Sequence, residues 1–465
     1  MFSSLRTNAA LLLAASCLLL TACGSESGEA GTPPEGTAPE GATTFYEDVA
    51  PILVHSCDKC HAPGGIAPMR LDTAAEAKKW GPAMKAAVAN RSMPPWLMTS
   101  DGSCGEYIGS EWLSQAEIDT IGKWVDDGMW AGDESKAPAK PTPESTLGSD
   151  ALDVPMPETY TAKNPGGPGN SEAHYDDYRC FMVDPKLTKD RFVTATEIVA
   201  GDPEIVHHVV VFSVNPLAFP VQAPSFGTNG NVMADLEENN SERPGWPCYA
   251  GAGKGVIMDT ILAAWAPGSG VNHYPKGTGL RLKKGNVIVM QVHYNVSKKD
   301  ASDKTTLRLL MKDKVEREAW MALHDPFLFS SFGDNSQSLQ PGLKKSLANW
   351  SATPADLAFW LPKGTEPEKE ILGVFPHMHT YGRKMRMTID RGDNKDAQCV
   401  ADVHRWDFNW QRMYYFKDAI KFGPKDTLRT VCTYDTSSKT KPLYPGFGTD
   451  DEMCLMGLYI TTVAK

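Results

Sequence analysis

The chain has 465 residues, of which 41% are hydrophobic and 22% are charged, and its formal net charge is −11. This length allows two to four domains, and the composition is that of an ordinary soluble globular protein. The acidic balance, without a long basic run, argues against nucleic acid as a partner and against anchoring to a membrane by a basic patch.

The first 22 residues predict a lipoprotein signal peptide. Arg6 supplies the positive charge, and residues 9–20 form an apolar run that is too short to span a bilayer comfortably. The run ends in Leu-Thr-Ala-Cys, which is typical of a bacterial lipobox, so we expect Cys23 to be lipidated and to become the first residue of the mature protein. An ordinary signal peptide followed by an incidental cysteine is the alternative.

Residues 23–42 predict a flexible tether, because they are rich in Gly, Glu, Pro, Ser and Thr. No later segment of the sequence is long and apolar enough to span a membrane. We therefore expect a protein of the bacterial cell envelope, on the periplasmic side or at the outer membrane, that meets the membrane only through its lipid anchor.

Residues 43–134 carry a helical pattern. Residues 45–55 lead into a Cys-Asp-Lys-Cys-His motif, and residues 74–90 are rich in Ala and Lys, although the Gly-Pro pair at 81–82 predicts a break there. A capping box at residues 114–117 opens a run with one apolar stripe that ends at a glycine. A helix before the motif and an amphipathic helix at the end are typical of a small class I cytochrome c domain.

The motif at residues 57–61 predicts a covalently attached haem. Cys57 and Cys60 are three residues apart and can reach both haem vinyl groups from one helical turn, while His61 directs its imidazole at the iron. A structural disulfide or a zinc site is the alternative.

Four methionines are candidates for the sixth iron ligand: Met69, Met84, Met93 and Met98. We favour Met93, because it begins Met-Pro-Pro-Trp, an extended and rigid segment after a helix. A His/Met pair raises the reduction potential of the haem, which suits electron transfer rather than oxygen binding.

Residues 135–150 are rich in proline and predict a semi-rigid linker. After it the pattern changes to β-branched runs separated by Gly, Pro and Asn, at residues 192–199, 205–214, 286–296, 305–311, 385–390 and 454–463. The remaining length exceeds one sandwich, so we expect two antiparallel, jelly-roll-like β-sandwiches at residues 151–318 and 319–465. The predicted fold class is thus multidomain, with a small all-α cytochrome c domain followed by two β-sandwich domains.

The β-rich half contains histidines in pairs. Residues two apart on a strand share a face, so His377 and His379 can bind one metal ion without distortion. His207 and His208 would point to opposite faces of a regular strand. They can share one ion only if the strand ends or bulges there.

A fifth histidine and a methionine complete the set of candidate ligands. His293 shares a strand face with Gln291 and Asn295 in an otherwise apolar run, so these polar side chains need partners. Met453 lies in Asp-Glu-Met-Cys. Taken singly, the histidines are typical of surface or core residues and Met453 of a core methionine. Together, five imidazoles and one thioether are the ligand set of a two-copper protein.

Between about Tyr175 and Ile460 the chain resembles the copper type II, ascorbate-dependent monooxygenases, which include peptidylglycine α-hydroxylating monooxygenase and dopamine β-monooxygenase. The resemblance rests on His-His within a β-run, Gln-Val-His-Tyr, His-x-His followed by a glycine, and Asp-Glu-Met-Cys, in the family's order along the chain. It implies an electron-transferring copper held by His207, His208 and His293. It implies a second, catalytic copper that activates oxygen and is held by His377, His379 and Met453.

The same resemblance places Gln291 and Tyr178 beside the gap between the two coppers. Three other positions depart from the peptide-amidating members. Phe375 stands where those members carry an arginine that grips the peptide carboxylate, and Leu455 and Gly457 stand where they carry substrate-contacting asparagine and tyrosine. A carboxylate without an arginine partner would be poorly held, so we expect a more apolar substrate than a C-terminal glycine peptide.

Six cysteines remain after the signal and the haem motif, and in an exported chain they are most simply three disulfides. The resemblance implies a bond between Cys180 and Cys248 in the first sandwich. Cys432 and Cys454 fall on consecutive late strands, where a bridge would fix the backbone of Met453, so we pair them as well.

This pairing leaves Cys104 with Cys399. A bridge between them would hold the helical domain against the second sandwich at a fixed distance, rather than leaving docking to diffusion. Two free buried thiols are the alternative.

The sequence therefore predicts a copper- and O2-dependent monooxygenase that hydroxylates a C–H bond of a small, apolar substrate. The fused haem would deliver two electrons per turnover to the first copper, after receiving them from an external periplasmic donor. Two other classes remain. A periplasmic copper-binding or redox-relay protein would cycle copper without substrate-dependent oxygen uptake. A surface lipoprotein whose sandwiches bind glycans or partners would keep its function when His377 is replaced.

Overall fold

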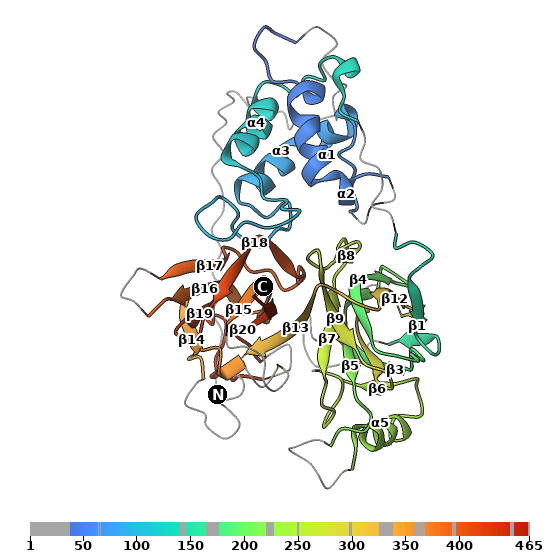
Figure 1. Ribbon diagram of the computed structural model, residues 1–465. Coiled ribbons are helices and arrows are strands. Elements are labelled where there is room, and N and C mark those ends of the chain that lie inside the picture. The colour runs from blue at the N-terminus through green and yellow to red at the C-terminus, as the bar shows by residue number, and fades with distance from the viewer. Residues whose placement is uncertain are drawn as a thin grey trace, which may run out of the picture.

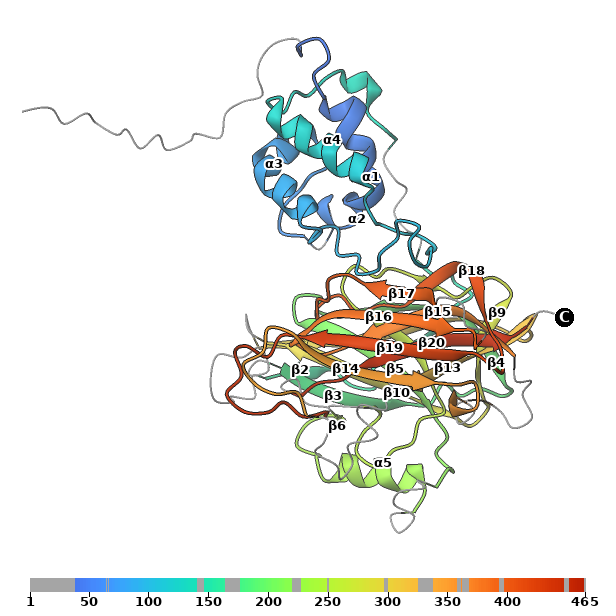
Figure 2. The same cartoon turned by 90° about the vertical axis from the view of Figure 1, so that its left-hand side faces the viewer.

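The computed structural model describes residues 38–463, apart from residues 64, 66, 140–145, 164–175, 220–226, 249–250, 297–299, 325–337, 358–360, 362–367, 393–396 and 447–450. A helical domain stands on two β-sandwiches that lie side by side (Figure 1), and the turned view shows the layers of strands beneath it (Figure 2). The predicted signal peptide, Cys23 and most of the tether lie outside the described residues. Among those described, no helix is both long and apolar enough to cross a membrane.

The helical domain has an apolar core of its own. Its elements are the π-helical turn η1 (Phe45–Val49), α1 (Ala50–Ser56), α2 (Asp58–His61), α3 (Ala74–Ala89), α4 (Gln115–Asp126) and the 3₁₀ turn η2 (Glu134–Lys136). Ser114 and Glu117 form the predicted capping box at the start of α4. The apolar stripe of α4, with Ile121 and Trp124 fully enclosed, packs against Phe45 in this core.

The predicted break at Gly81 and Pro82 is wrong, because α3 continues through both residues as one helix. An interior proline costs a helix one backbone hydrogen bond and about 3 kcal/mol relative to alanine. Packing offsets this cost here, since α3 contributes several buried side chains to the domain core. Gly81 faces Met129 so closely that a Cβ at this position would collide with Met129 Sδ.

The sandwiches are built from three large sheets and one small one. The first sandwich has a five-stranded sheet in the order β6-β3-β10-β5-β7, formed by β3 (Asp176–Val183), β5 (Val206–Val214), β6 (Trp246–Pro247), β7 (Thr260–Trp265) and β10 (Val287–Asn295). The second has a four-stranded sheet in the order β14-β19-β16-β17, formed by β14 (Ser346–Ala352), β16 (Gly382–Asp390), β17 (Gln398–Val403) and β19 (Thr427–Tyr434).

A nine-stranded sheet runs through both sandwiches in the order β1-β12-β4-β9-β13-β20-β15-β18, with β8 paired to β4. Its strands are β1 (Leu152–Pro155), β4 (Arg191–Val199), β8 (Asn272–His273), β9 (Thr278–Leu282), β12 (Thr306–Lys312), β13 (Arg317–His324), β15 (Lys369–His377), β18 (Tyr414–Phe422) and β20 (Leu455–Thr462). The small sheet pairs β2 (Tyr160–Ala162) with β11 (Ala301–Asp303), and α5 (Asn229–Glu238) lies beyond the first sandwich.

The strand β13 joins the two sandwiches. It pairs in parallel with β9 of the first half and antiparallel with β20 of the second. The division expected between residues 318 and 319 therefore falls inside a strand. Side chains from both halves also share one apolar cluster, in which Met321, Tyr415 and Tyr459 pack with first-half residues. Backbone pairing and a shared core thus fix the two sandwiches relative to each other.

The segment 96–108, which connects α3 to α4, is built into the second sandwich. Its backbone bonds β17 and β18: Thr99 N donates to Asp402 O at 2.8 Å, and Ile108 N donates to Tyr415 O at 2.8 Å. Met98 and Tyr107 are fully buried in the core of that sandwich. The helical domain is therefore docked on the second sandwich by an apolar anchor within its own sequence.

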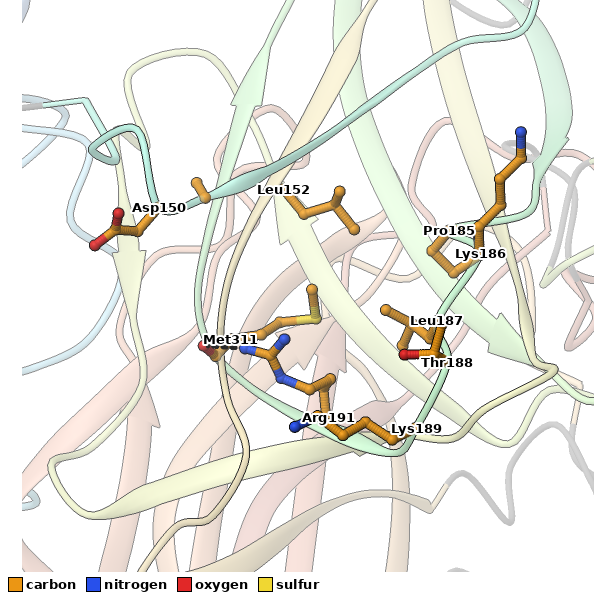
Figure 3. Close-up of a pocket in the computed structure, with 10 residues that line it drawn as sticks. Asp150, Leu152, Pro185, Lys186, Leu187, Thr188, Lys189, Arg191 and Met311 are labelled. Carbon is orange, nitrogen blue, oxygen red and sulfur yellow. Dashed lines mark hydrogen bonds between the residues drawn. The ribbon is translucent and has the colours of Figure 1, made fainter.

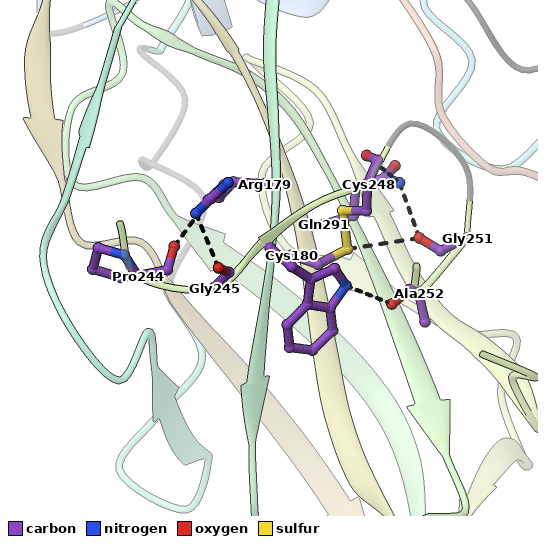
Figure 4. The surroundings of a disulfide bond; sticks show 9 residues. Arg179, Cys180, Pro244, Gly245, Cys248, Gly251, Ala252 and Gln291 are labelled. Atoms are coloured by element: carbon purple, nitrogen blue, oxygen red, sulfur yellow. Dashed lines mark hydrogen bonds between the residues drawn. A yellow bond between two sulfur atoms is a disulfide. The ribbon is translucent and has the colours of Figure 1, made fainter. Parts of the chain in front are cut away.

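Within the part of the chain that the structure describes there are three disulfides, and they are the three pairs expected from the sequence: Cys104–Cys399, Cys180–Cys248 and Cys432–Cys454. The first joins segment 96–108 to β17. The second fastens the loop after β6 to β3 (Figure 4). The third joins β19 to the residue before β20, and so links the two sheets of the second sandwich.

Candidate metal centres

A β-bulge brings His207 and His208 to the same side of the first sandwich. In the pairing of β5 with β10, His208 lies opposite His293, but the next residue of β10, Tyr294, lies opposite Val206. His207 is thus an extra residue in its strand, which frees it from the alternation that would turn it away. His207 and His208 could share one metal ion only if the strand ended or bulged between them. The structure has such a bulge at the start of β5.

The three imidazoles converge through their Nδ1 atoms. The Nδ1–Nδ1 distances are 3.3 Å between His207 and His208, 3.2 Å between His207 and His293, and 3.0 Å between His208 and His293. Nitrogens that share one metal ion, each about 2.0–2.1 Å from it, lie roughly 3.3–3.6 Å apart. The first histidine group (His207, His208 and His293) therefore has nearly the spacing of a three-nitrogen metal site.

The outer nitrogens show which atoms carry the lone pairs. His207 Nε2 donates to Asn409 Oδ1 at 2.8 Å, and His293 Nε2 lies 2.9 Å from Asp176 Oδ1. With the proton of His207 on Nε2, the Nδ1 lone pair of this ring faces the other two imidazoles, an arrangement that a bound cation relieves. Tyr178 stacks flat on His293, with ring centroids 4.0 Å apart.

Burial keeps the rings of His208 and His293 neutral. It lowers the pKa of His208 and His293 well below the ordinary value, and the neighbouring imidazoles, which would repel a second positive charge, lower the pKa of both further. Neutral imidazole is the form that binds a metal ion.

His377 and His379 form the second histidine pair, at the end of β15 and just beyond it. Their ring centroids are 5.1 Å apart. His377 Nδ1 donates to Gln411 Oε1 at 2.6 Å, and His379 Nδ1 donates to the Asp451 carbonyl at 3.1 Å. Both bonds leave Nε2 as the nitrogen available to a metal ion.

Glu452 ties the backbone of Met453 to that of His379. One of its carboxylate oxygens, Oε2, accepts from the backbone N–H of His379 at 2.9 Å and from that of Met453 at 3.2 Å, while Oε1 accepts from Tyr381 N at 2.7 Å. Burial raises the pKa of Glu452 to about 8, although these backbone donors act in the opposite direction. The fully buried carboxyl group therefore ties the two candidate ligand segments together.

The loop 406–412, which precedes β18, reaches both groups. The Phe408 ring lies 6.4 Å from the rings of His207 and His208 and 6.1 Å from that of His379. Asn409 and Gln411, which bond His207 and His377, belong to the same loop. No metal-binding motif or hydrophobic periodicity marks this loop in the sequence, and its role follows only from the fold.

Comparison with known proteins agrees with this arrangement. The N-terminal domain of the copper type II ascorbate-dependent monooxygenases matches residues 168–301, and the C-terminal domain of the same family matches residues 352–462. Together the two domains cover more than half of the chain and include all six candidate ligands. The chain belongs to the copper type II ascorbate-dependent monooxygenase family.

Named members of this family are similar to the chain at a distance. Tyramine beta-hydroxylase of Caenorhabditis briggsae is 24% identical over 280 residues, which cover 56% of this chain and 40% of that protein. Human DBH-like monooxygenase protein 1 is 26% identical over 263 residues, 56% of this chain and 39% of that protein. Rat dopamine beta-hydroxylase is 22% identical over 332 residues, 69% of this chain and 47% of that protein. The chain thus spans about two fifths of the length of the first two.

The positions at which the chain departs from the peptide-amidating members of the family are neighbours in the sheet. Phe375 of β15 lies opposite Gly457 of β20, and His377 lies opposite Leu455. The Phe375 ring is parallel to that of His377, with centroids 6.4 Å apart. The surroundings of the second histidine pair are therefore apolar on this side.

The Gln291 side chain turns toward the Cys180–Cys248 disulfide. Its Nε2 donates to the carbonyls of Cys248 at 3.3 Å and Gly251 at 3.0 Å (Figure 4). Gln291 supports the loop after β6. Tyr178, the other residue expected beside the gap, is in contact with the first histidine group.

The motif at residues 57–61 lies on α2 and the turn before it. Among the described cysteines, Cys57 and Cys60 are the two that form no disulfide. Burial raises the pKa of Cys57 to about 12, and nearby acidic groups add to this effect. His61 Nδ1 donates to the Met69 carbonyl at 3.0 Å, which leaves Nε2 free for a ligand on the other side of the ring.

The four candidate axial methionines lie in different surroundings. Met84 is part of the core of the helical domain, and Met98 is part of the core of the second sandwich. Met69 directs its carbonyl at His61. Met93 is 37% exposed, and its side chain belongs to neither core.

A cavity of about 340 Å³ lies away from these centres, at the edge of the first sandwich (Figure 3). Leu152, Leu187, Lys189, Arg191 and Met311 are among its lining residues. Arg191 Nε is 2.9 Å from an oxygen of Asp313, and its Nη2 donates to the Met311 carbonyl. The Arg191 cation in this cavity is thus already paired with protein groups.

Proposed function

We propose that this protein is a copper- and O2-dependent monooxygenase that hydroxylates a C–H bond of a small, apolar substrate, with electrons supplied by a haem in its own N-terminal domain. The observation that carries the proposal is the convergence of three Nδ1 atoms, 3.0–3.3 Å apart, in a chain of the copper monooxygenase family.

Each half of the site would hold one copper ion. His207, His208 and His293 offer three imidazoles, which tolerate both oxidation states of copper and so suit an electron carrier. His377 and His379 with the Met453 thioether favour the cuprous state, which binds dioxygen. The metal supplies oxygen activation, while the protein orients the ligands: Asn409, Gln411 and the Asp451 carbonyl fix the ring nitrogens, and Glu452 holds Met453 beside His379.

The N-terminal domain would hold a covalent haem on Cys57 and Cys60, with His61 and Met93 as axial ligands. The two free thiols in a chain whose other described cysteines are paired support this assignment, as does the orientation of His61. Docking through segment 96–108 and Cys104–Cys399 supports a role as an internal electron donor. An external periplasmic protein would re-reduce the haem, and the lipid on Cys23 would hold the enzyme at the envelope membrane.

The substrate would be more apolar than a peptide carboxylate. Relatives of the chain are named for tyramine and dopamine as substrates. Here the apolar ring of Phe375 lies parallel to that of His377, with centroids 6.4 Å apart.

Metal analysis and isotope labelling test the proposal together. We expect two copper ions and one covalent haem per chain, and 18O in a product when candidate lipids, sterols and aromatic compounds are incubated with 18O2. Copper that cycles between oxidation states without substrate-dependent oxygen uptake would favour a redox-relay protein instead. Zinc in place of copper under copper-replete expression would contradict the proposal.

A further inference from the structure

The loop 406–412 is bonded to both histidine groups at once. On one side, Asn409 Oδ1 accepts from His207 Nε2 at 2.8 Å, although the two residues belong to different sandwiches. On the other, Gln411 Oε1 accepts from His377 Nδ1 at 2.6 Å. The loop is internally braced, since Gln411 Nε2 donates to the Phe408 carbonyl at 2.8 Å.

The same loop faces the helical domain through its last residue. Arg412 Nη1 is 3.7 Å from an oxygen of Glu111, and that oxygen is 3.9 Å from Lys59 Nζ, within the Cys57–His61 motif. The Arg412 guanidinium also lies over the ring of Trp96, 5.3 Å from its centroid.

We propose that the 406–412 loop is the junction that couples the helical domain to both metal centres, and that Arg412 and Glu111 are positioning residues for electron entry. This inference rests on the proposed haem and coppers. Each transfer would move one electron from a ferrous haem, held by Cys57, Cys60 and His61, to a cupric ion at one of the histidine groups, with no net proton. Only a few residues of the loop separate Arg412, next to the haem motif, from Asn409, next to His207.

Docking and coupling are separable in this structure. The Cys104–Cys399 bond and the buried side chains of Met98 and Tyr107 hold the helical domain in place through contacts other than the Arg412–Glu111 pair. Removing the Arg412–Glu111 contact should therefore leave the domain docked and change only the route between centres. A misplacement of reacting groups by a fraction of their spacing is enough to slow a reaction strongly.

The chain offers a matched control. Lys417 Nζ and Glu106 Oε2 form an ion pair at 3.1 Å between the same two parts of the protein, with both side chains more than half exposed. This pair touches neither the 406–412 loop nor the haem motif in any contact described. Variants of the Lys417–Glu106 pair therefore show the effect of losing an ion pair between these two parts by itself.

The experiment uses the full chain, loaded with copper and haem, without substrate or oxygen. The haem is reduced by a light flash, and its absorbance follows electron transfer to copper. We expect Arg412→Gln and Glu111→Gln each to slow this transfer by at least about tenfold. The double variant should be no slower than either single one, since both remove the same contact. Lys417→Gln and Glu106→Gln should transfer at the wild-type rate.

Further readouts separate the outcomes. Copper EPR spectra should be unchanged in Arg412→Gln, and Arg412→Lys should restore part of the rate. Wild-type transfer in both Arg412→Gln and Glu111→Gln, or an equal slowing in Lys417→Gln, overturns the inference while leaving the proposed function intact. Protein that carries no covalent haem overturns the proposed function itself. If Arg412→Gln does not fold, Asn409→Ala provides the same test, with slower transfer expected and an unchanged rate contradicting the junction.

Discussion

Cys104 and Cys399 are bonded to each other across 295 residues of sequence, and the bond joins the helical domain to β17 of the second sandwich. Around it, Trp96, Leu97, Met98 and Tyr107 are buried among residues of that sandwich. A segment of the N-terminal part thus completes the core of the C-terminal part. The two parts form one structural unit, although the first sandwich lies between them in the sequence.

We predict that the double variant Cys104→Ala, Cys399→Ala is less stable but still docked. Loss of a disulfide typically lowers the free energy of unfolding by about 2–5 kcal/mol. The buried aromatic residues of segment 96–108 remain, so the helical domain should stay in contact with the sandwich. Denaturant unfolding measures the stability, and limited proteolysis measures docking. Rapid release of the helical domain as a separate fragment would show that the bond, not the apolar anchor, holds it.

Replacement of a single ligand in the first histidine group should remove one copper. We expect His208→Ala to bind one copper where the wild type binds two, because the remaining Nδ1 atoms of His207 and His293 no longer form a three-nitrogen site. Metal analysis of purified protein gives the stoichiometry. His273→Ala is the control, since His273 is exposed on β8 and belongs to no group of converging ligands among the described residues. Two coppers in His208→Ala would exclude this histidine as a ligand.

Met453→Ile should impair the second metal centre and leave the first intact. We expect the variant to keep its haem and the first copper but to lose turnover. Replacing a residue that hydrogen-bonds a metal ligand typically lowers metal affinity or activity roughly 10–100-fold. Loss of a ligand itself should lower activity at least as much. Met456→Ile is a matched control, because Met456 is a fully buried methionine on the adjoining strand β20. Product formation at the wild-type rate in Met453→Ile would remove Met453 from the catalytic centre.

Much of the site could be predicted because its residues recur in short local patterns. His-His, Gln-Val-His-Tyr and His-x-His each place a ligand on a strand or at its end, and the strands β4, β5, β10, β12, β16 and β20 lie within one to three residues of the predicted runs. The need for a bulge or strand end at His207 could be deduced from the alternation of side chains between the two faces of a strand, and the structure has this bulge.

What escaped prediction depends on long-range packing. The sequence offered Met98 as one of four candidate iron ligands, yet this side chain is enclosed by the second sandwich. The 406–412 loop carries no periodic signal, because its contacts lie with residues about 200 and 300 positions away in the sequence. The direction of the Gln291 side chain depended on the position of the loop after β6, which no local pattern specifies.

Glu452→Gln should weaken the second centre through the backbone rather than through a ligand. The wild-type carboxyl group accepts hydrogen bonds from the backbone of His379, Tyr381 and Met453 while fully buried. Glutamine has one acceptor oxygen, and its NH2 group would face at least one of these N–H donors. A buried donor without a partner costs about 1–3 kcal/mol, so we expect a lower free energy of unfolding in denaturant titrations.

The same change should reach the metal, because Glu452 holds the backbones of His379 and Met453 against one oxygen. We expect the copper held by His377, His379 and Met453 to be bound more weakly, while EPR of the first copper is unchanged. Glu368→Gln is the control, since this residue precedes β15 and contacts neither ligand segment in the described hydrogen bonds. Unaltered copper affinity together with unaltered stability in Glu452→Gln would contradict the view that this carboxyl group organises the centre. Lower stability with full affinity would limit its role to the fold.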